Sequence, residues 1–254
     1  MTRRQPGHSP SEASYGLGPF GDPPALSWAI PRRVDPTAYC AAMPLRHSEP
    51  IGVESTLAAA RRMATDGRRR LLGLTGAPGC GKSTLAGQLA SQLPGRSVVV
   101  PMDGFHLAAS ELDRLGRAAR KGAPDTFDAW GFLALVHRLS GNTEPVVYAA
   151  QYRRDLHNAV AGAIPVPRET PLVILEGNYL LLEEQPWAQL RPLFSELWFV
   201  EVDERTRLER LIARHIATGK TEQDARAWAL GPDEANAALV RATRARADVV
   251  VWRD

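Results

Sequence analysis

Residues 76–84 combine glycine, lysine and hydroxyl side chains in the pattern G-x-x-x-x-G-K-[ST], which is typical of loops that bind a triphosphate. Glycines in this pattern adopt positive φ angles and turn successive backbone N–H groups toward the anion. Lys82 supplies a positive charge for the β- and γ-phosphates, while Ser83 offers a Mg²⁺ ligand and Thr84 an α-phosphate contact. The predicted nucleotide-binding residues are Gly76, Ala77, Pro78, Gly79, Cys80, Gly81, Lys82, Ser83 and Thr84. We therefore expect ATP as co-substrate and Mg²⁺ as its metal ion.

Such a loop needs a buried strand before it and a helix after it. Residues 71–75 form a short apolar run that is typical of a buried strand. Residues 84–93 carry apolar side chains at helical spacing until a Pro-Gly pair at 94–95 ends the pattern. The flanking sequence thus supplies both elements that would position the loop.

Three acidic residues directly follow other apolar runs, where an open parallel sheet binds its ligands. Asp103 is predicted to be the base that accepts the proton of an attacking hydroxyl. Glu176 is typical of an acid that holds Mg²⁺ directly or through water. Asp203 is predicted to cap the helix that begins at the next residue.

Each candidate also has a structural alternative. Asp103 could cap a helix instead, and Glu176 could be a carboxylate that stabilises a turn. His106, three residues after Asp103, either contacts the acceptor or packs locally.

The composition of the 254-residue chain indicates which kinds of binding partner to expect. The net charge of +3 comes mostly from arginine, and basic residues are scattered among acids without interleaved aromatic residues, so we expect no nucleic-acid partner. No apolar run approaches the roughly 20 residues of a membrane span, so we expect no membrane partner.

Lysine occurs only at positions 82, 121 and 220. Cys40 and Cys80 cannot build a disulfide framework, which favours a cytoplasmic location.

The chain divides near residue 50. Residues 1–50 hold nine of the twenty prolines and show no sustained periodicity, which predicts a flexible extension. A short packed piece at 36–43, or a translation start at Met43, are alternatives for part of it. Residues 51–254 are predicted to form one α/β domain with a mostly parallel sheet covered on both faces. Further strands are predicted at 97–102, 145–148, 171–175, 196–202 and 247–252, and helices at 53–63, 128–139, 204–218 and 221–230.

Three ordered segments, at residues 102–106, 120–128 and 175–179, resemble signatures of the phosphoribulokinase, uridine kinase and bacterial pantothenate kinase group of P-loop kinases. The resemblance covers roughly residues 71–254 and is strongest to bacterial nucleoside/nucleotide kinase-like and fructose-transport-kinase-like members. It implies the three-layer sandwich of P-loop NTPases, with a mostly parallel central sheet and a small helical lid at approximately 204–230.

The same resemblance implies roles for individual residues. It makes Asp103 the catalytic base and Glu176 the acid associated with Mg²⁺, in agreement with their positions after strands. It places Asp125 in the acceptor-binding segment, with Arg120 and Lys121 beside that pocket. In the next segment, uridine kinases usually carry a Tyr-Asp pair. This chain has Tyr152, Arg153 and Arg154 there, followed by His157, which weakens a uridine assignment. The predicted substrate-binding residues are Asp103, His106, Arg120, Lys121, Asp125, Tyr152 and Arg154.

The predicted lid helix carries Arg207, Arg210 and Arg214 on one face. It resembles the arginine-bearing lid of these kinases, in which Arg210 and Arg214 would close over the phosphates and exclude water. The alternative is a solvated basic face. Lys220, just beyond this helix, is predicted to lie at the surface.

The leading interpretation is an ATP-dependent kinase that phosphorylates a hydroxyl of a nucleoside, a sugar or a pantothenate-like alcohol. The alternative is a nucleotide-binding regulatory ATPase without a small-molecule acceptor. A GTPase switch is disfavoured because the chain has no Asn-Lys-x-Asp element, and a nucleic-acid motor because it has no aromatic and basic groove. The sequence leaves a homodimer open.

Overall fold

The computed structural model of the protein describes residues 51–153, 155–156 and 158–253, all within one compact unit that spans Pro44–Asp254. The predictions made for the N-terminal extension, including Met43 and Cys40, lie outside these residues. So do those that concern Arg154 and His157. No helix of the described part is long and apolar enough to cross a membrane.

The core of the unit is a five-stranded sheet in the order β2-β5-β1-β6-β7, and every neighbouring pair is parallel. Its strands are β1 (Arg70–Thr75), β2 (Ser97–Pro101), β5 (Leu172–Glu176), β6 (Glu196–Glu201) and β7 (Val249–Trp252). The predicted parallel sheet is therefore confirmed, and the apolar runs form it because both of its faces are covered. The register pairs Glu176 with Leu74 and with Pro101, so the three segments that follow β1, β2 and β5 emerge side by side.

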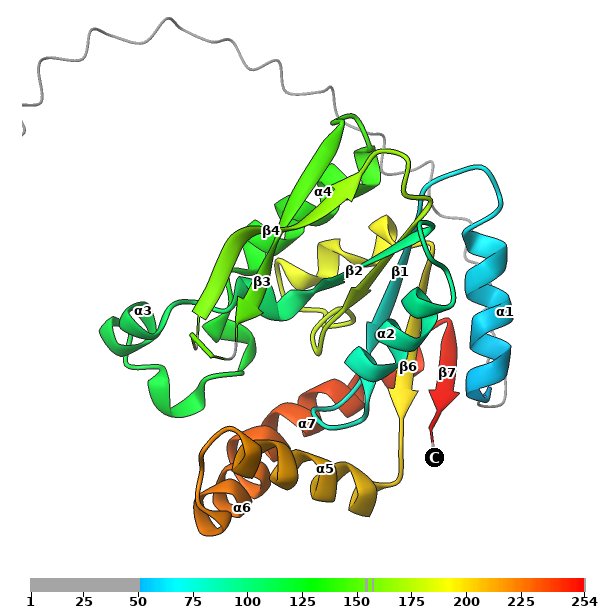
Figure 1. Ribbon diagram of the computed structural model, residues 1–254. Helices are drawn as coiled ribbons and strands as arrows, with labels where there is room; N and C mark the ends of the chain where they lie inside the picture. The colour runs from blue at the N-terminus through cyan, green and yellow to red at the C-terminus, as the bar shows by residue number, and fades with distance from the viewer. Residues whose placement is uncertain (1–50, 154, 157, 254) are drawn as a thin grey trace, which may run out of the picture. The chain divides into compact units, whose positions relative to one another are not determined.

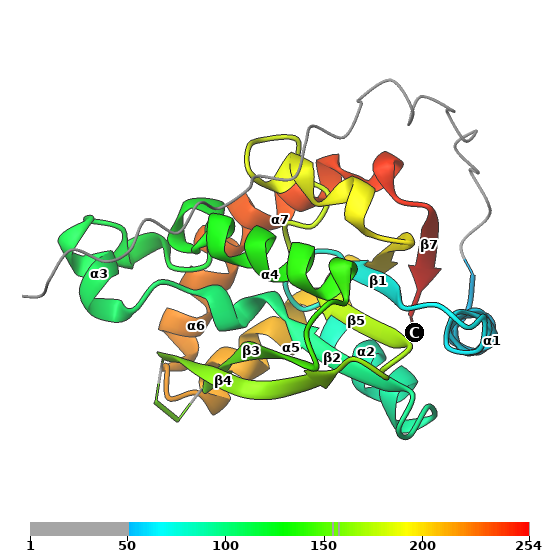
Figure 2. The ribbon, with the colours of Figure 1, turned by 90° about the horizontal axis from the view of Figure 1, so that it is seen from above.

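Helices cover both faces of the sheet, which confirms the three-layer sandwich. One face packs against α1 (Val53–Met63) and α2 (Lys82–Ser91), and the other against α4 (Ala129–Gly141) and α7 (Pro232–Ala242). Figure 2 shows α4 and α2 on opposite sides of β1 and β5. Strand residues contribute alternately to the two cores, because Leu72 and Leu74 face α1 and α2 while Leu71 faces α4.

One predicted strand lies outside the central sheet. The predicted strand at 145–148 overlaps the start of β3 (Val146–Arg153), which pairs antiparallel with β4 (Asn158–Pro167) in a separate two-stranded sheet. Figure 1 shows this hairpin extending away from the central strands. Strand β4 was not predicted, because its run contains Gly162 and two prolines and most of its residues are exposed.

A helical lid follows the carboxyl end of β6. It consists of α5 (Glu204–Ala217), α6 (Glu222–Leu230) and α7, and the arrowhead of β6 points toward it in Figure 1. The predicted helices at 204–218 and 221–230 are confirmed, whereas α7 and the short α3 (Ala109–Arg114) were not predicted. Asp203 caps α5 as expected, since its carboxylate accepts a hydrogen bond of 2.9 Å from the Thr206 backbone N–H.

Candidate active site

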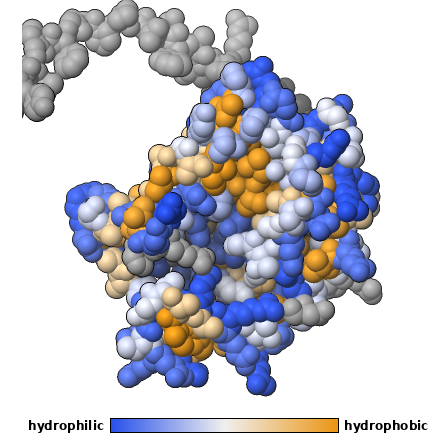
Figure 3. All heavy atoms as spheres, in the orientation of Figure 1, coloured by the Kyte–Doolittle hydropathy of each residue, from blue (hydrophilic) through white to orange (hydrophobic). Residues whose placement is uncertain are grey.

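A cavity of about 390 Å³, called here the central cavity, opens at the carboxyl edge of the sheet between the lid and the β3–β4 hairpin. The space-filling view shows the hollow on this face of the molecule (Figure 3). Its wall brings together many of the residues predicted from the sequence: Pro78, Lys82, Ser83, Asp103, His106, Lys121, Tyr152, Glu176 and Arg214. This volume is in the range of pockets that enclose a small molecule.

The loop between β1 and α2 has the backbone that its sequence predicts. Gly76, Gly79 and Gly81 have φ angles of 148°, 89° and 94°. A Cβ at Gly76 would lie 2.4 Å from the Val200 carbonyl oxygen, and one at Gly79 would lie 2.7 Å from the Arg207 carbonyl oxygen. Both positions are therefore restricted to glycine by conformation and by space.

The Lys82 ammonium is held inside the loop that carries it. Its Nζ donates hydrogen bonds of 2.9 Å to the Gly76 carbonyl and 3.3 Å to the Ala77 carbonyl, and the side chain is buried. Cys80, in the same loop, has a buried side chain. The lysine is thus positioned by backbone contacts, with its charge directed at the space that the loop encloses.

Ser83 and Glu176 form a hydrogen-bonded pair at the start of α2 and the end of β5. The Ser83 hydroxyl donates to Glu176 Oε1 over 3.0 Å, and the carboxyl is buried. Burial, followed by the charge of nearby Asp103, raises the pKa of Glu176 to about 7, against the opposing effects of Lys82 and the Ser83 hydrogen bond. A hydroxyl and a single buried carboxylate suit Mg²⁺, which binds few protein ligands and retains waters or phosphate oxygens.

Because the pKa of Glu176 rises from 4.5 to about 7, the folded protein binds this proton more tightly than the unfolded chain does. The contribution of Glu176 to the free energy of unfolding is therefore full below about pH 4.5 and lost as the pH rises through about 7. In metal-free protein, Glu176→Gln is expected to raise this free energy by about 1–3 kcal/mol at pH 8 and to change it little at pH 5. Thermal unfolding with a chelator at both pH values measures this. An equal change at both would contradict the assigned cause.

Asp103 lies in a short 3₁₀ turn, Met102–Phe105, directly after β2, and half of its side chain is exposed to the cavity. Its Oδ1 is 3.9 Å from Nε2 of His106, whose ring stacks on Phe127 at a centroid distance of 4.0 Å. Burial lowers the pKa of His106, and Lys121 lowers it further against the opposing charge of Asp103. The histidine is therefore neutral near pH 7, and it forms a fixed polar edge beside the carboxylate.

Gly104, the glycine after Asp103, lets the β3–β4 hairpin pack closely against the turn. A Cβ at this position would lie 2.2 Å from the carbonyl oxygen of Ala150 in β3. The constraint is tertiary, and it fixes the Asp103 turn relative to β3.

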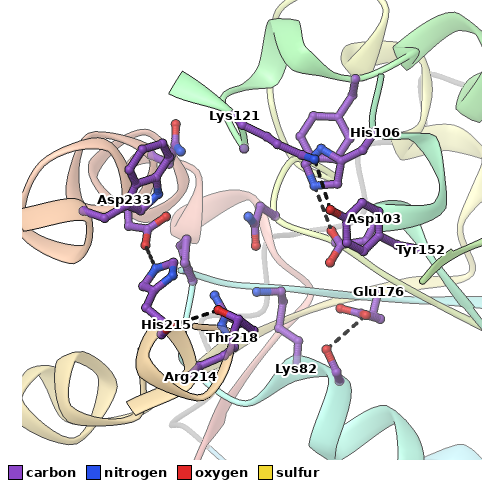
Figure 4. A pocket seen from close by; sticks show the side chains of 18 of the residues that line it. Lys82, Asp103, His106, Lys121, Tyr152, Glu176, Arg214, His215, Thr218 and Asp233 are labelled. Atoms are coloured by element: carbon purple, nitrogen blue, oxygen red, sulfur yellow. Dashed lines mark hydrogen bonds and ion pairs between the residues drawn. The ribbon is translucent and has the colours of Figure 1, made fainter. Parts of the chain in front are cut away.

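Tyr152 and Lys121 join the cavity wall from β3 and from the loop before residue 124. Lys121 Nζ donates a 3.0 Å hydrogen bond to the Tyr152 hydroxyl, and the Tyr152 ring meets His106 edge-on at 5.3 Å (Figure 4). These three side chains form one continuous wall beside Asp103.

Asp125 and Arg120, both predicted to be substrate-binding residues, are not part of the cavity wall. The Asp125 carboxylate pairs with Arg120 at 2.5 Å and with Arg117 at 3.3 Å. These ion pairs hold together the loop that carries Lys121. Asp125 therefore has arginine partners in this structure, and its role in acceptor binding stays a prediction.

Two lid arginines lie beside the phosphate-binding loop. Arg210 and Arg214 line a second hollow there, together with Thr84. Arg253, at the end of β7, lines the same hollow and donates a 2.7 Å hydrogen bond to the Gly81 carbonyl. Sequence reasoning missed Arg253, although its position directly after an apolar run marks the same sheet edge as Asp103.

Arg207, the third arginine of this face, anchors the lid. Its side chain is only 2% exposed. It donates hydrogen bonds of 2.8 Å to Glu204 in α5, 2.5 Å to Glu234 in α7 and 3.0 Å to the Pro78 carbonyl of the phosphate-binding loop. One guanidinium thus joins two lid helices to the loop.

Arg207→Ala is expected to destabilise the protein by about 3 kcal/mol, because it removes a buried cation that satisfies three acceptors. For a domain of this size the expected fall in melting temperature is roughly 6–12 °C. Arg205→Ala, on the same helix at 88% side-chain exposure, is the matched control and should change the melting temperature little. Equal effects of the two substitutions would show that Arg207 is not an anchor.

The lid contributes cavity residues that sequence reasoning did not find. His215 Nε2 lies 2.6 Å from Asp233 Oδ2, and Figure 4 shows this pair facing Lys121 and His106 across the cavity. Lys220, predicted to lie at the surface, is in the wall and sits 4.5 Å from the ring centroid of Trp228. Asn178, which follows β5, and the buried Asn236 of α7 also line the cavity. Asp233 and Asn236 were missed because α7 was not predicted.

Comparison with known proteins identifies the class of protein to which this chain belongs. No family model matches the chain. "Uncharacterized protein YggC" of Escherichia coli is 37% identical over 193 residues, or 72% of this chain and 78% of the relative. A Schizosaccharomyces pombe protein named "Putative uridine kinase" is 36% identical over 169 residues, or 62% of this chain and 72% of the relative. The crystal structure of a "putative fructose transport system kinase" from Silicibacter sp. TM1040 has a TM-score of 0.71 at 37% identity, covering 79% of this chain and 98% of that one.

The loop, the parallel sheet and the helical lid together define a P-loop kinase. The chain belongs to the family of P-loop kinases that contains these uridine-kinase-like and fructose-transport-kinase-like proteins. Membership in this family implies that the chain uses ATP.

Proposed function

We propose that this kinase transfers the γ-phosphate of ATP to a hydroxyl of a small molecule, in the class of nucleosides, sugars or pantothenate-like alcohols. The observation that carries the proposal is the position of Asp103. Its half-exposed carboxylate shares one cavity with Lys82 of the phosphate-binding loop and with the Ser83–Glu176 pair. A regulatory ATPase without an acceptor would not need a carboxylate at this place.

The proposed reaction has one chemical step. The acceptor hydroxyl oxygen forms a bond to the γ-phosphorus while its proton passes to the Asp103 carboxylate. The bond from the γ-phosphorus to the β,γ-bridging oxygen breaks, and ADP leaves. Lys82, next to the leaving oxygen, stabilises the charge that develops on the phosphates.

Ser83 and Glu176 are the residues that would hold Mg²⁺. When bound, this ion would neutralise charge on the β- and γ-phosphates. The neutral His106 ring lies beside Asp103, with its Nε2 3.9 Å from Asp103 Oδ1. Arg210 and Arg214 come from the lid, so they can approach the phosphates and exclude water when the lid closes.

The size of the cavity and the names of relatives support a small acceptor. A volume of about 390 Å³ accommodates a molecule such as a sugar or a nucleoside. The relatives from Schizosaccharomyces pombe and Silicibacter carry names that refer to uridine and to fructose transport. A nucleoside and a ketose are therefore the first acceptors to test.

The test is release of ADP by the full-length protein with ATP and Mg²⁺ across a panel of nucleosides, ketoses, aldoses, pantothenate and vitamin-like ribosides. Asp103→Asn measures the background for every member of the panel. Acceptor-dependent release far above that background supports the proposal. Bound ATP without any acceptor-dependent release would contradict it and would favour a nucleotide-binding regulatory ATPase.

A further inference from the structure

The lysines of this chain are distributed unevenly. The chain contains 28 arginines but only three lysines, and all three lysines line the central cavity. Lys82 comes from the phosphate-binding loop, Lys121 from the loop after the 3₁₀ turn Ala118–Arg120, and Lys220 from the connection between α5 and α6. Apart from histidine, every other basic residue of the chain is arginine. All of the lysines therefore lie at this one site.

The two side chains differ in what they recognise. Arginine presents a flat, rigid fork, whereas the ammonium of lysine is a compact charge with three rotatable donors. Lys82 is already explained by the phosphates of ATP. Lys121 and Lys220 have no role in the proposed phosphoryl transfer, although they lie on the body wall and the lid wall of the same cavity.

The acidic residues of the cavity have partners other than Lys220. Glu176 pairs with Ser83, and Asp233 lies 2.6 Å from His215. Asp103 faces the hydroxyl that is to be phosphorylated. Lys220 lies against the Trp228 ring and forms no ion pair with a carboxylate among residues 51–153, 155–156 and 158–253. At Lys220 the lid wall therefore presents positive charge beyond what the nucleotide and the base use.

Taking the proposed function as the starting point, we propose that Lys121 and Lys220 form an anion subsite, so that the true acceptor carries a phosphate or carboxylate group besides the hydroxyl that is phosphorylated. The contacts around each lysine fit this role. Tyr152 fixes Lys121 through a 3.0 Å hydrogen bond, and the Trp228 ring supports the Lys220 ammonium at 4.5 Å. Asn236, which is buried in the same wall, adds an amide.

The subsite also connects the acceptor to the lid. An anion held by Lys220 of the lid and by Lys121 of the body favours the arrangement in which the two walls approach each other. The same approach brings Arg214, also in the lid, toward the phosphate-binding loop. The enzyme would thereby favour an anionic acceptor over a neutral analogue, and over water, as the recipient of the phosphoryl group.

The experiment compares matched acceptors with the full-length protein and ATP. The pairs are fructose with fructose 6-phosphate, ribose with ribose 5-phosphate, glycerol with glycerate, and pantothenol with pantothenate. We expect the anionic member of at least one pair to have a KM at least about tenfold lower than its neutral partner. The pairs also separate a phosphate from a carboxylate as the recognised group.

Variants assign this preference to the two lysines. Lys121→Gln and Lys220→Gln are each expected to raise the KM for the anionic acceptor about tenfold to a hundredfold, with the KM for ATP changed less than about threefold. Lys220→Arg keeps the charge and should restore part of the affinity. Arg226→Gln removes an exposed charge from the same lid and is the matched control, expected to leave both KM values unchanged.

The outcomes separate this inference from the proposed function. If neutral and anionic acceptors are used with equal kcat/KM, or if the glutamine variants leave the acceptor KM unchanged, the anion subsite is wrong although the kinase activity stands. If no acceptor on the panel releases ADP, calorimetric titration of the anionic probes into protein loaded with a non-hydrolysable ATP analogue decides the question. Binding that Lys220→Gln weakens supports the subsite, and binding that it does not weaken, or no binding, overturns it.

Discussion

Lys82→Ala is expected to reduce kcat by roughly a thousandfold, because the lysine supplies the charge closest to the phosphates in the loop. Its ammonium is buried and fixed by the Gly76 and Ala77 carbonyls, so no reorganisation is needed when charge develops on the transferred group. Arg210 and Arg214 line the hollow beside the same loop but come from the lid, so they are not expected to replace a cation that is held inside the loop.

The measurement is ADP release at saturating ATP with the acceptor that the panel identifies. Lys82→Arg should also lose most activity, because the planar guanidinium does not fit the pair of carbonyls that holds the compact ammonium. Circular dichroism and melting temperature establish that each variant is folded. Turnover within tenfold of the wild-type value would remove Lys82 from the catalytic mechanism.

Local sequence patterns predicted the part of the site that belongs to the parallel sheet. The loop needs only its own glycines and the flanking strand and helix, so its pattern determines its backbone. Asp103 and Glu176 followed from the rule that ligands bind at the carboxyl ends of parallel strands, and the register of β5 with β1 and β2 places them there. Their placement at this edge could be predicted because it depends on residues close together in the chain, and their chemical roles stay predictions.

The lid wall depends on contacts between distant residues, and the sequence could not show them. Asp233 faces His215 across 18 positions, and Arg207 reaches Glu234 across 27. Asp125 is a second example of contacts that the sequence could not show. Its motif resembles an acceptor-binding segment, whereas in the structure its carboxylate pairs with Arg117 and Arg120 outside the cavity wall. A carboxylate's role is set by its three-dimensional neighbours, which a motif does not specify.

The charges of the site affect both the stability of the protein and its proposed function. Burial makes the charged form of Glu176 unfavourable in metal-free protein, and a bound cation would offset that cost. The lid arginines, the lysine of the loop and the proposed anion subsite place further positive charge around the same space. A site with this arrangement is stabilised by its anionic substrates and is least stable without them.

Asp103→Asn is expected to lower kcat by roughly a hundredfold or more while sparing the affinity for ATP. The amide has the same shape as the carboxylate but cannot accept the proton of the attacking hydroxyl. The packing of the turn should survive, because the backbone of residues 102–105 is fixed by the contact between Gly104 and β3, and the His106 ring is held by Phe127. The loss should therefore appear in kcat and not in the melting temperature.

Asp125→Asn is the matched control for this experiment, since it makes the same chemical change at a carboxylate that lies outside the cavity wall. We expect it to retain kcat within about threefold, because its ion pairs are partly exposed and stabilise a loop. Full activity in Asp103→Asn would refute the assignment of the base. A large loss of kcat in Asp125→Asn, with wild-type behaviour in Asp103→Asn, would instead support the role that family resemblance gave to Asp125, and would move the acceptor hydroxyl to the other side of Lys121.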